Sequence, residues 1–395
     1  MRALQLLRRA LKKRLEFMHA KTEEAMWRGV LGVLRSGQLW LTALGRGLSG
    51  ETTAKHRIKA ADRLLGSENL HESVPAIYQS LAHFLIGQLG RPCISIDWTG
   101  VGPHHYLLSA SLSFCGRALP IFSRIFHKSQ KGSPTAAREF LRQFADIVPP
   151  TCTPVLITDA GFYYQWFDQV RSLGWHFIGR LRGRVSVKLD GVWQPLSVLH
   201  CIAGRKPKCL GVVSTNRTRR REVRVVLSSR PKLKGRKNLT RKGTSRRDTI
   251  AKRTSSGARE PLVLATSLTD CGPKSIVTRY ARRMQIEECF RDLKAHRYGW
   301  SLQHVRSRTP ERIEVLVLLA ALGIVVMHVI GLAAERARIH FNYQANTIRK
   351  RRVFSTFFLA RLHLQDNAAT PLAPDELKRG FARLHVMIRY ASATA

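Results

Sequence analysis

Acidic residues are scarce in this 395-residue chain, which has 26 aspartates and glutamates against 67 lysines and arginines. A formal net charge of +41 makes the chain repel itself unless a polyanion is present. Nucleic acid is the first partner that this imbalance predicts, and an anionic membrane surface is the second. The apolar share of 44% is ordinary for a globular protein and weighs against a scaffold protein without a core.

The chain also lacks the cysteine spacing of a zinc site or a disulfide framework. Its seven cysteines are odd in number, and no two have Cys-x-x-Cys spacing. We therefore expect reduced thiols in a cytosolic protein. The N-terminal segment alternates basic and apolar residues, without the long apolar core and cleavage site of a signal peptide.

One segment, 315–333, is apolar over nearly the minimum length of a membrane span and contains only His328 as a polar exception. Basic residues flank it on both sides, so it carries no orientation signal. We expect a buried helix and no membrane association. A membrane-associated basic protein is the alternative, and it rests on this segment alone.

Residues 91–182 show the pattern of a mixed α/β sheet. Two apolar strands end on aspartates, Asp97 and Asp159, and two further strands flank the tight turn at Cys115-Gly116. Helically spaced apolar residues indicate helices over 134–147 and 163–173, and another strand follows at 175–183. The order β-β-β-α-β-α-β predicts an α/β fold with helices on the faces of a mixed sheet.

The remaining chain divides by composition. We predict an N-terminal helical domain over 1–80, a core over 81–185 and 262–305, a β-rich basic insertion over 186–261 and a C-terminal helical region over 306–395. A cationic stretch, 231–257, is nearly devoid of large apolar residues and is expected to be mobile without DNA. A basic amphipathic helix within 52–66 suits insertion into a DNA groove, although a solvated charged face is the alternative. Its basic residues are Lys55, Arg57, Lys59 and Arg63.

Familiar catalytic motifs are missing: there is no Gly-x-Ser-x-Gly elbow, no P-loop and no His-Glu-x-x-His. A helix predicted over 276–296 instead gathers polar residues on one narrow face, at 100° per residue. These residues are Tyr280, Arg283, Glu287 and Lys294. The adjacent acids Glu288 and Asp292 point away from that face. One carboxylate among cations suits a metal-assisted reaction on a phosphate backbone.

Three carboxylates can meet at the strand ends of such a sheet: Asp97, Asp159 and Glu287. Hard oxygen ligands suit Mg²⁺, and two such ions can support an in-line displacement at phosphorus. Each residue also has an ordinary structural interpretation. Either aspartate can form a turn or cap a helix, and Glu287 can pair with Arg283 or Arg291 on the surface.

The spacing Tyr-(2)-Arg-(3)-Glu-(6)-Lys, together with SIDWT, ITDAGF and MQIEECFRDLK, resembles the DDE transposases of the bacterial insertion-sequence family four. The likeness runs from about residue 40 to beyond residue 355. It implies an RNase H-like core interrupted by a β-rich insertion, with Asp97, Asp159 and Glu287 as ligands of two Mg²⁺ ions, for which Mn²⁺ can substitute. Tyr280, Arg283 and Lys294 would then hold phosphates of the element's terminal DNA.

The same resemblance implies a homodimer on double-stranded DNA, in the bacterial cytoplasm and associated with the nucleoid. The N-terminal basic helices would recognise inverted-repeat ends, and the reaction would be cut-and-paste transposition through strand nicking, a hairpin and strand transfer into target DNA. One departure is Leu262, where relatives tend to carry a tryptophan that stacks a flipped base. Two alternatives stay open: a transposase-derived DNA-binding protein without catalysis, and an RNase H-like nuclease without strand transfer.

Overall fold

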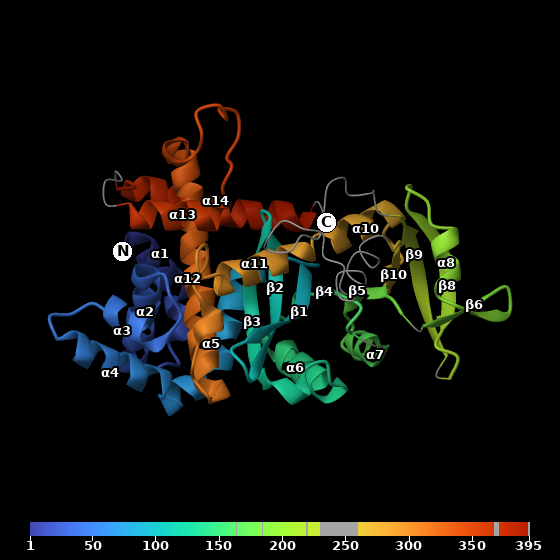
Figure 1. Ribbon diagram of the computed structural model, residues 1–395, viewed down its shortest axis with the longest axis horizontal. Coiled ribbons are helices and arrows are strands. Elements are labelled where there is room, and N and C mark those ends of the chain that lie inside the picture. Colours follow the sequence, from blue (N-terminus) through green and yellow to red (C-terminus); the bar gives the residue numbers. More distant parts are fainter. Residues whose placement is uncertain (163, 184, 219, 230–259, 367–370, 394–395) are drawn as a thin grey trace, which may run out of the picture. The chain divides into compact units, whose positions relative to one another are not determined.

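The computed structural model describes residues 1–162, 164–183, 185–218, 220–229, 260–366 and 371–393 (Figure 1). The predicted cationic loop over 231–257 lies outside the described residues. The chain forms two compact units. Unit 1 contains Met1–Pro154 and Arg282–Ala395, and unit 2 contains Val155–Ala281. The division into four domains that was predicted from composition stays a prediction.

Unit 1 is built largely from helices, as the apolar spacing at both ends of the chain predicts. Leu4, Leu7 and Leu11 recur at helical intervals and are all buried on one face of the first helix. The helices of unit 1 are α1 (Arg2–Leu11), α2 (Ala20–Ser36), α3 (Leu41–Gly47), α4 (Ala54–Leu65), α5 (Glu68–Ile86), α6 (Pro134–Ile147), α11 (Met284–Lys294), α12 (Pro310–Arg336), α13 (Thr356–Gln365) and α14 (Pro374–Ala393), with short 3₁₀ turns at Lys12–Leu15, Lys128–Gln130, Leu302–His304 and Ile339–Tyr343.

Helix α12 is the centre of this unit. It packs against α2, α5, α13, α14 and strand β3 (Arg117–His127) and runs between them (Figure 1). It is long and apolar enough to cross a membrane, with a mean hydropathy of 2.8, yet that window is 100% buried within the described structure. Gly331 lets α13 approach closely, because a β-carbon there would collide with the backbone carbonyl of Thr356. The prediction of a buried helix at 315–333 is confirmed.

Three antiparallel strands complete unit 1 in the order β3-β2-β1. Strands β2 (His105–Phe114) and β3 are joined at Cys115 and Gly116, whose φ angles of 50° and 79° form the predicted tight turn. Strand β1 (Cys93–Val101) corrects one prediction, since it continues past Asp97 instead of ending there. The extension arises because Trp98 and Thr99 pair with Leu108 and Leu107 of β2.

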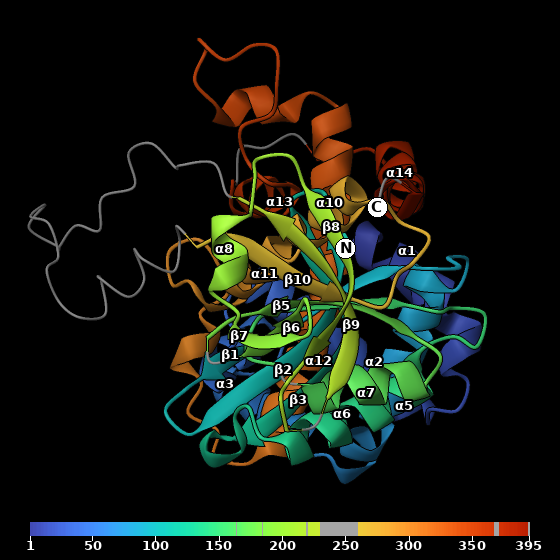
Figure 2. The same cartoon turned by 90° about the vertical axis from the view of Figure 1, so that its right-hand side faces the viewer.

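Among the residues that the structure describes, unit 2 holds seven strands in the order β4-β5-β10-β9-β8-β6-β7. Strands β8 and β9 of this unit are seen in Figure 2. Strands β4 and β5 are parallel and the other pairs are antiparallel, so the predicted mixed α/β fold is confirmed. Strand β8 was not predicted, because Gly211 and exposed Val212 interrupt its pattern. The elements are β4 (Val155–Thr158), α7 (Tyr164–Ser172), β5 (His176–Leu181), β6 (Ser186–Leu189), β7 (Val192–Pro195), α8 (Val198–Cys201), β8 (Lys208–Thr215), β9 (Arg221–Ser228), β10 (Leu262–Thr266) and α10 (Pro273–Ala281).

The helix predicted over 276–296 is in fact two helices. Helix α10 ends at Ala281 and α11 begins at Met284, with Arg282 and Arg283 between them. The phase argument therefore does not extend from α11 back to Tyr280. It holds within α11 for Glu287 and Lys294, and it includes Arg283 only as the N-cap residue of α11, one turn before Glu287.

Candidate active site

Two of the predicted acids, Asp97 and Glu287, share one cationic partner in unit 1. The guanidinium of Arg283 donates from Nη1 to Asp97 Oδ2 at 2.8 Å and from Nη2 to Glu287 Oε1 at 2.7 Å. Asp97 Oδ1 also accepts a hydrogen bond from the backbone nitrogen of Trp98 at 2.8 Å. The side chains of Arg283 and Asp97 are 12% and 14% exposed, whereas that of Glu287 is 44% exposed. The two carboxylates are thus held together around one positive charge.

The fourth residue of the predicted signature, Lys294, joins the same site from the last turn of α11. Its Nζ donates to the hydroxyl of Thr99 at 2.8 Å. Burial lowers the pKa of Lys294 from its ordinary value. Asp97 and Thr99 are two residues apart in β1. Because side chains along a strand return to the same face every two residues, both point toward α11. That period was the signal in the sequence by which Thr99 could have been found.

An open cleft of 510 Å³ lies between β1 and α11. Asp97 and Thr99 line it from the strand, Glu287, Phe290 and Lys294 line it from the helix, and Gln303 lines it from the segment after α11. The cleft combines two carboxylates, an amine and a hydroxyl with an apolar ring. Such a surface can accept a charged backbone on one side and hold it against the carboxylates.

The other two residues predicted for this site belong to unit 2. Asp159 directly follows β4, as predicted, and its Oδ1 accepts a hydrogen bond from the backbone nitrogen of Gly161 at 2.8 Å. Tyr280 is buried near the end of α10. Leu262, the position of the missing tryptophan, is buried in β10, while Trp193 is half-buried in β7.

The basic helix predicted within 52–66 is α4, which buries Ala61, Leu64 and Leu65. Most of its basic side chains face solvent, and Arg57 is half-buried with Nη1 3.4 Å from the Gly50 carbonyl oxygen. The exposed members are Lys55, Lys59 and Arg63. The helix therefore presents a cationic face, which suits either of the two interpretations made from the sequence.

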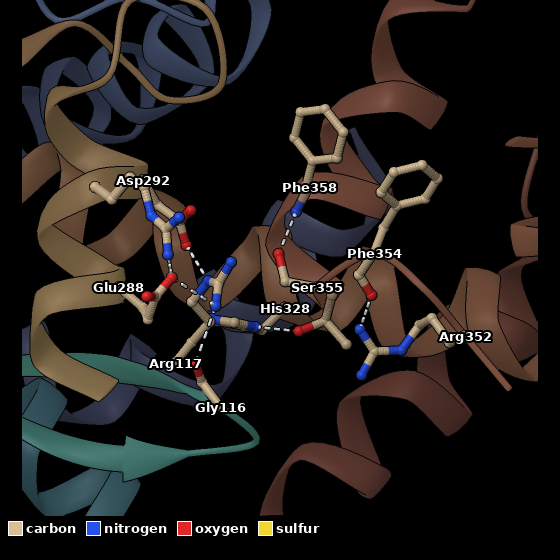
Figure 3. Close-up of polar contacts among 11 residues, drawn as sticks. Gly116, Arg117, Glu288, Asp292, His328, Arg352, Phe354, Ser355 and Phe358 are labelled. Atoms are coloured by element: carbon tan, nitrogen blue, oxygen red, sulfur yellow. Dashed lines mark hydrogen bonds and ion pairs between the residues drawn. The ribbon is translucent and has the colours of Figure 1, made fainter. Parts of the chain in front are cut away.

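The opposite side of α11 is held by a network that sequence reasoning missed (Figure 3). Arg117, just after the β2–β3 turn, donates from Nε to Asp292 Oδ2 at 2.7 Å, and its Nη1 lies 3.3 Å from Glu288 Oε2. Glu288 also pairs with Arg291. Glu288 and Asp292 therefore point away from Glu287, as the helical phase predicted. No local pattern links Arg117 to α11, because the contact spans 175 residues.

A buried histidine, His328, lies next to this network (Figure 3). His328 Nδ1 and Thr356 Oγ1 are 2.6 Å apart, which connects α12 to α13. Burial, together with the nearby positive charges of Arg117 and Arg352, lowers the pKa of His328 from 6.5 to about 3. The ring is therefore neutral at physiological pH, and its role is packing between helices.

Asp292 predicts a measurable pH dependence of stability. Burial raises the pKa of its carboxyl from 3.8 to about 6, against the opposing effect of Arg117. Between those values the folded chain binds more protons than the unfolded chain, so stability falls as pH rises through 6, by roughly 3 kcal/mol in full. We expect Asp292→Asn to remove this slope in urea unfolding compared between pH 4 and pH 7. An unchanged slope would contradict the assignment.

The donor set in unit 1 fits a divalent metal ion in part. Asp97 and Glu287 supply hard oxygen ligands of the kind that Mg²⁺ prefers, and Arg283 occupies the position of a cation between them. Among the residues that the structure describes, no three His, Cys, Asp or Glu side chains form a ready-made metal site. A third carboxylate would complete the ligand set, and Asp159 is the predicted one.

The comparison with protein families agrees with this geometry. Residues 89–326, more than half of the chain, match the family described as Transposase DDE domain. No curated protein matches the chain. The matched range includes Asp97, Asp159 and Glu287, and the mixed α/β fold is consistent with an RNase H-like transposase core. The match supports a transposase function, performed by an enzyme of the transposase or nuclease type, in a family that generally uses divalent metal ions. The chain belongs to the Transposase DDE domain family.

Proposed function

We propose that this protein is a metal-dependent DNA transposase that moves an insertion sequence by a cut-and-paste route. The observation that carries the proposal is the pair of carboxylates, Asp97 and Glu287, gathered by Arg283 in an open cleft beside Lys294. The segments SIDWT, ITDAGF and MQIEECFRDLK support a finer placement within the insertion-sequence family four, since they closely resemble the transposase of the tetracycline-resistance transposon. We propose that this protein acts in the bacterial cytoplasm on nucleoid DNA and does not associate with a membrane.

In this mechanism Asp97, Asp159 and Glu287 would hold Mg²⁺, with two ions in the full site, and Mn²⁺ could take its place. When bound, the metal activates an oxygen nucleophile and stabilises the leaving oxygen at phosphorus. Asp97 and Glu287 become available as ligands when Arg283 turns from them toward a DNA phosphate. The guanidinium can exchange partners at small cost, because carboxylate and phosphate offer it the same bidentate geometry.

Lys294 and Tyr280 are the further phosphate contacts in this proposal, and the exposed basic side chains of α4 contact the inverted-repeat ends. Lys294 suits the role, because its amine lies at the cleft and donates to the hydroxyl of Thr99 instead of to a carboxylate. An ammonium without a paired acid retains its full attraction for a phosphate. A homodimer on the DNA would bring two such sites to the two ends.

Replacing the Lys294 charge should weaken DNA binding uniformly across sequences. For Lys294→Gln we expect the slope of log binding constant against log salt to fall by about 1 relative to the unmodified protein. Fluorescence anisotropy with a labelled duplex over a range of salt concentrations measures this slope. Lys131→Gln is the matched control, since that amine lies 4.5 Å from the Tyr106 ring centroid and does not line the cleft. An unaltered slope for Lys294→Gln would argue against a phosphate contact.

The reaction itself is tested with purified protein, Mg²⁺ and DNA that carries both ends of the element. We expect nicks with free 3′-OH groups, then hairpins, then joined products. Nicks alone would favour a nuclease without strand transfer. Binding without any nick would favour the DNA-binding protein without catalysis. Because Leu262 is buried and offers no aromatic face, the hairpin step is where this chain should depart most from its relatives.

A further inference from the structure

A second pocket in unit 1, of 670 Å³, lies beside the cleft and has aromatic walls. The rings of Trp40 and His296 are near parallel, at an interplanar angle of 21° with centroids 6.4 Å apart. The ring of His304 stands edge-on to both, at 87° to Trp40 and 80° to His296. Two neighbouring histidine rings and one tryptophan ring from far away in the sequence thus line one pocket.

Hydrogen bonds and packing hold together the segments that form this pocket. The backbone nitrogen of Leu39 donates to the Trp300 carbonyl oxygen at 2.8 Å, which ties the Trp40 segment to the loop after α11. Trp300 is 1% exposed and packs over Gly323 of α12. His296 is fixed in turn, with Nδ1 3.2 Å from the hydroxyl of Ser301. The rings are therefore positioned by the protein before any ligand arrives.

The charge around this pocket favours an anionic ligand with a flat apolar part. Arg306 lines the pocket, is exposed and has no ion-pair partner in the described ranges of the chain. Arg312 also lines it but is neutralised by Asp62 of α4. Hydroxyls of Thr42 and Ser307 provide hydrogen-bonding groups at the wall. Stacking surface, one free cation and a few hydroxyls together match a nucleotide.

The pocket and the cleft are continuous along the chain. Ala295 and Gln303 line the cleft, while the next residues, His296 and His304, line the aromatic pocket. The Nε2 atoms of Gln303 and His304 are 3.3 Å apart. A strand that leaves the Asp97–Glu287 site along Gln303 would therefore enter the pocket lined by His304 and Trp40.

We propose that the Trp40–His296–His304 pocket binds an unpaired nucleobase of DNA held in the neighbouring cleft. This inference rests on the proposed function, because it needs DNA in that cleft. Stacking on the Trp40 and His296 faces tolerates any base, and Arg306 contacts the adjoining phosphate. The pocket would hold the strand end in place and add affinity only when a base is unpaired.

The test compares two DNA probes that differ only in the bases of a single-stranded 3′ extension. One is a duplex with an extension of about four thymidines, and the other has an abasic extension of the same length. By fluorescence anisotropy at fixed salt, we expect the unmodified protein to prefer the thymidine probe by about 10-fold. Trp40→Ala should bring the ratio close to one, while Trp40→Phe should keep most of it. The control Trp193→Ala removes a tryptophan of unit 2 and should leave the ratio unchanged.

Retention of the ratio in Trp40→Ala, or a ratio near one in the unmodified protein, would overturn the inference. Binding of a blunt duplex by Trp40→Ala, compared with Trp40→Phe, shows whether the variant is folded and still holds DNA. Strand cleavage is assayed on the same preparations. If the unmodified protein cleaves DNA but shows no preference for the thymidine probe, the base pocket is wrong and the proposed function stands. A 10-fold ratio lost in Trp40→Ala, without cleavage by the unmodified protein, supports the pocket and defeats the transposase proposal.

Discussion

We expect strand cleavage to fall by at least about 1,000-fold in Asp97→Asn and in Glu287→Gln, while duplex binding persists. Both substitutions preserve shape and remove one negative charge from the pair that Arg283 bridges. An amide oxygen is a much poorer ligand for Mg²⁺ than a carboxylate, so the loss falls on the chemical step. The measurement is the rate of nicking of a labelled end-bearing duplex at saturating protein.

The adjacent acid supplies the control for this prediction. Glu288 neighbours Glu287 in sequence but faces Arg117 on the other side of α11. Glu288→Gln should therefore keep cleavage within about 10-fold of the unmodified protein, because it leaves the cleft intact. Equal losses in Glu287→Gln and Glu288→Gln would mean that both act through the stability of α11 and not through the metal site.

Arg117→Met should destabilise the protein by about 3–5 kcal/mol. The substitution leaves Asp292, whose side chain is 9% exposed, without its cationic partner in a buried position. It also frees Glu288 from the β2–β3 end of the sheet. Urea unfolding followed by circular dichroism measures the loss as a lower midpoint at constant slope.

Two further variants separate this effect from ordinary surface mutation. Arg138→Met removes an exposed arginine of α6 and should change stability by no more than about 0.5 kcal/mol. The double variant Arg117→Met with Asp292→Leu should regain much of the loss, because no buried charge is then left unpaired. A double variant that is less stable than Arg117→Met would show that the loss comes from packing and not from the ion pair.

The parts of the fold that depend on local pattern could be predicted from sequence. The β2–β3 hairpin follows from alternating apolar residues around Cys115-Gly116, and α6 follows from helically spaced Phe140 and Phe144. The burial of α12 was predicted from its flanking charges and is confirmed. Within the candidate site, the relation between Arg283, Glu287 and Lys294 was predictable because Glu287 and Lys294 share one face of α11 and Arg283 caps its N-terminus.

The remainder depends on contacts that no local pattern contains. Strand β1 extends past Asp97 because β2 pairs with it there, and the helix predicted as continuous breaks at Arg282 and Arg283. Arg117 and Trp40 lie far in sequence from the elements that they contact. Arg283 was expected to hold a phosphate, whereas in the structure it pairs with two carboxylates. Its phosphate contact stays a proposal.

The proposed metal role of Asp97 is tested most directly by Asp97→Cys. A thiolate binds Mg²⁺ poorly and Mn²⁺ better, so metal preference should change if this side chain is a ligand. We expect Asp97→Cys to be inactive in Mg²⁺ and to regain strand cleavage in Mn²⁺, while Asp97→Ala stays inactive in both. Equal inactivity of Asp97→Cys in the two metals, from a folded protein that binds DNA, would contradict a metal-ligating role for Asp97.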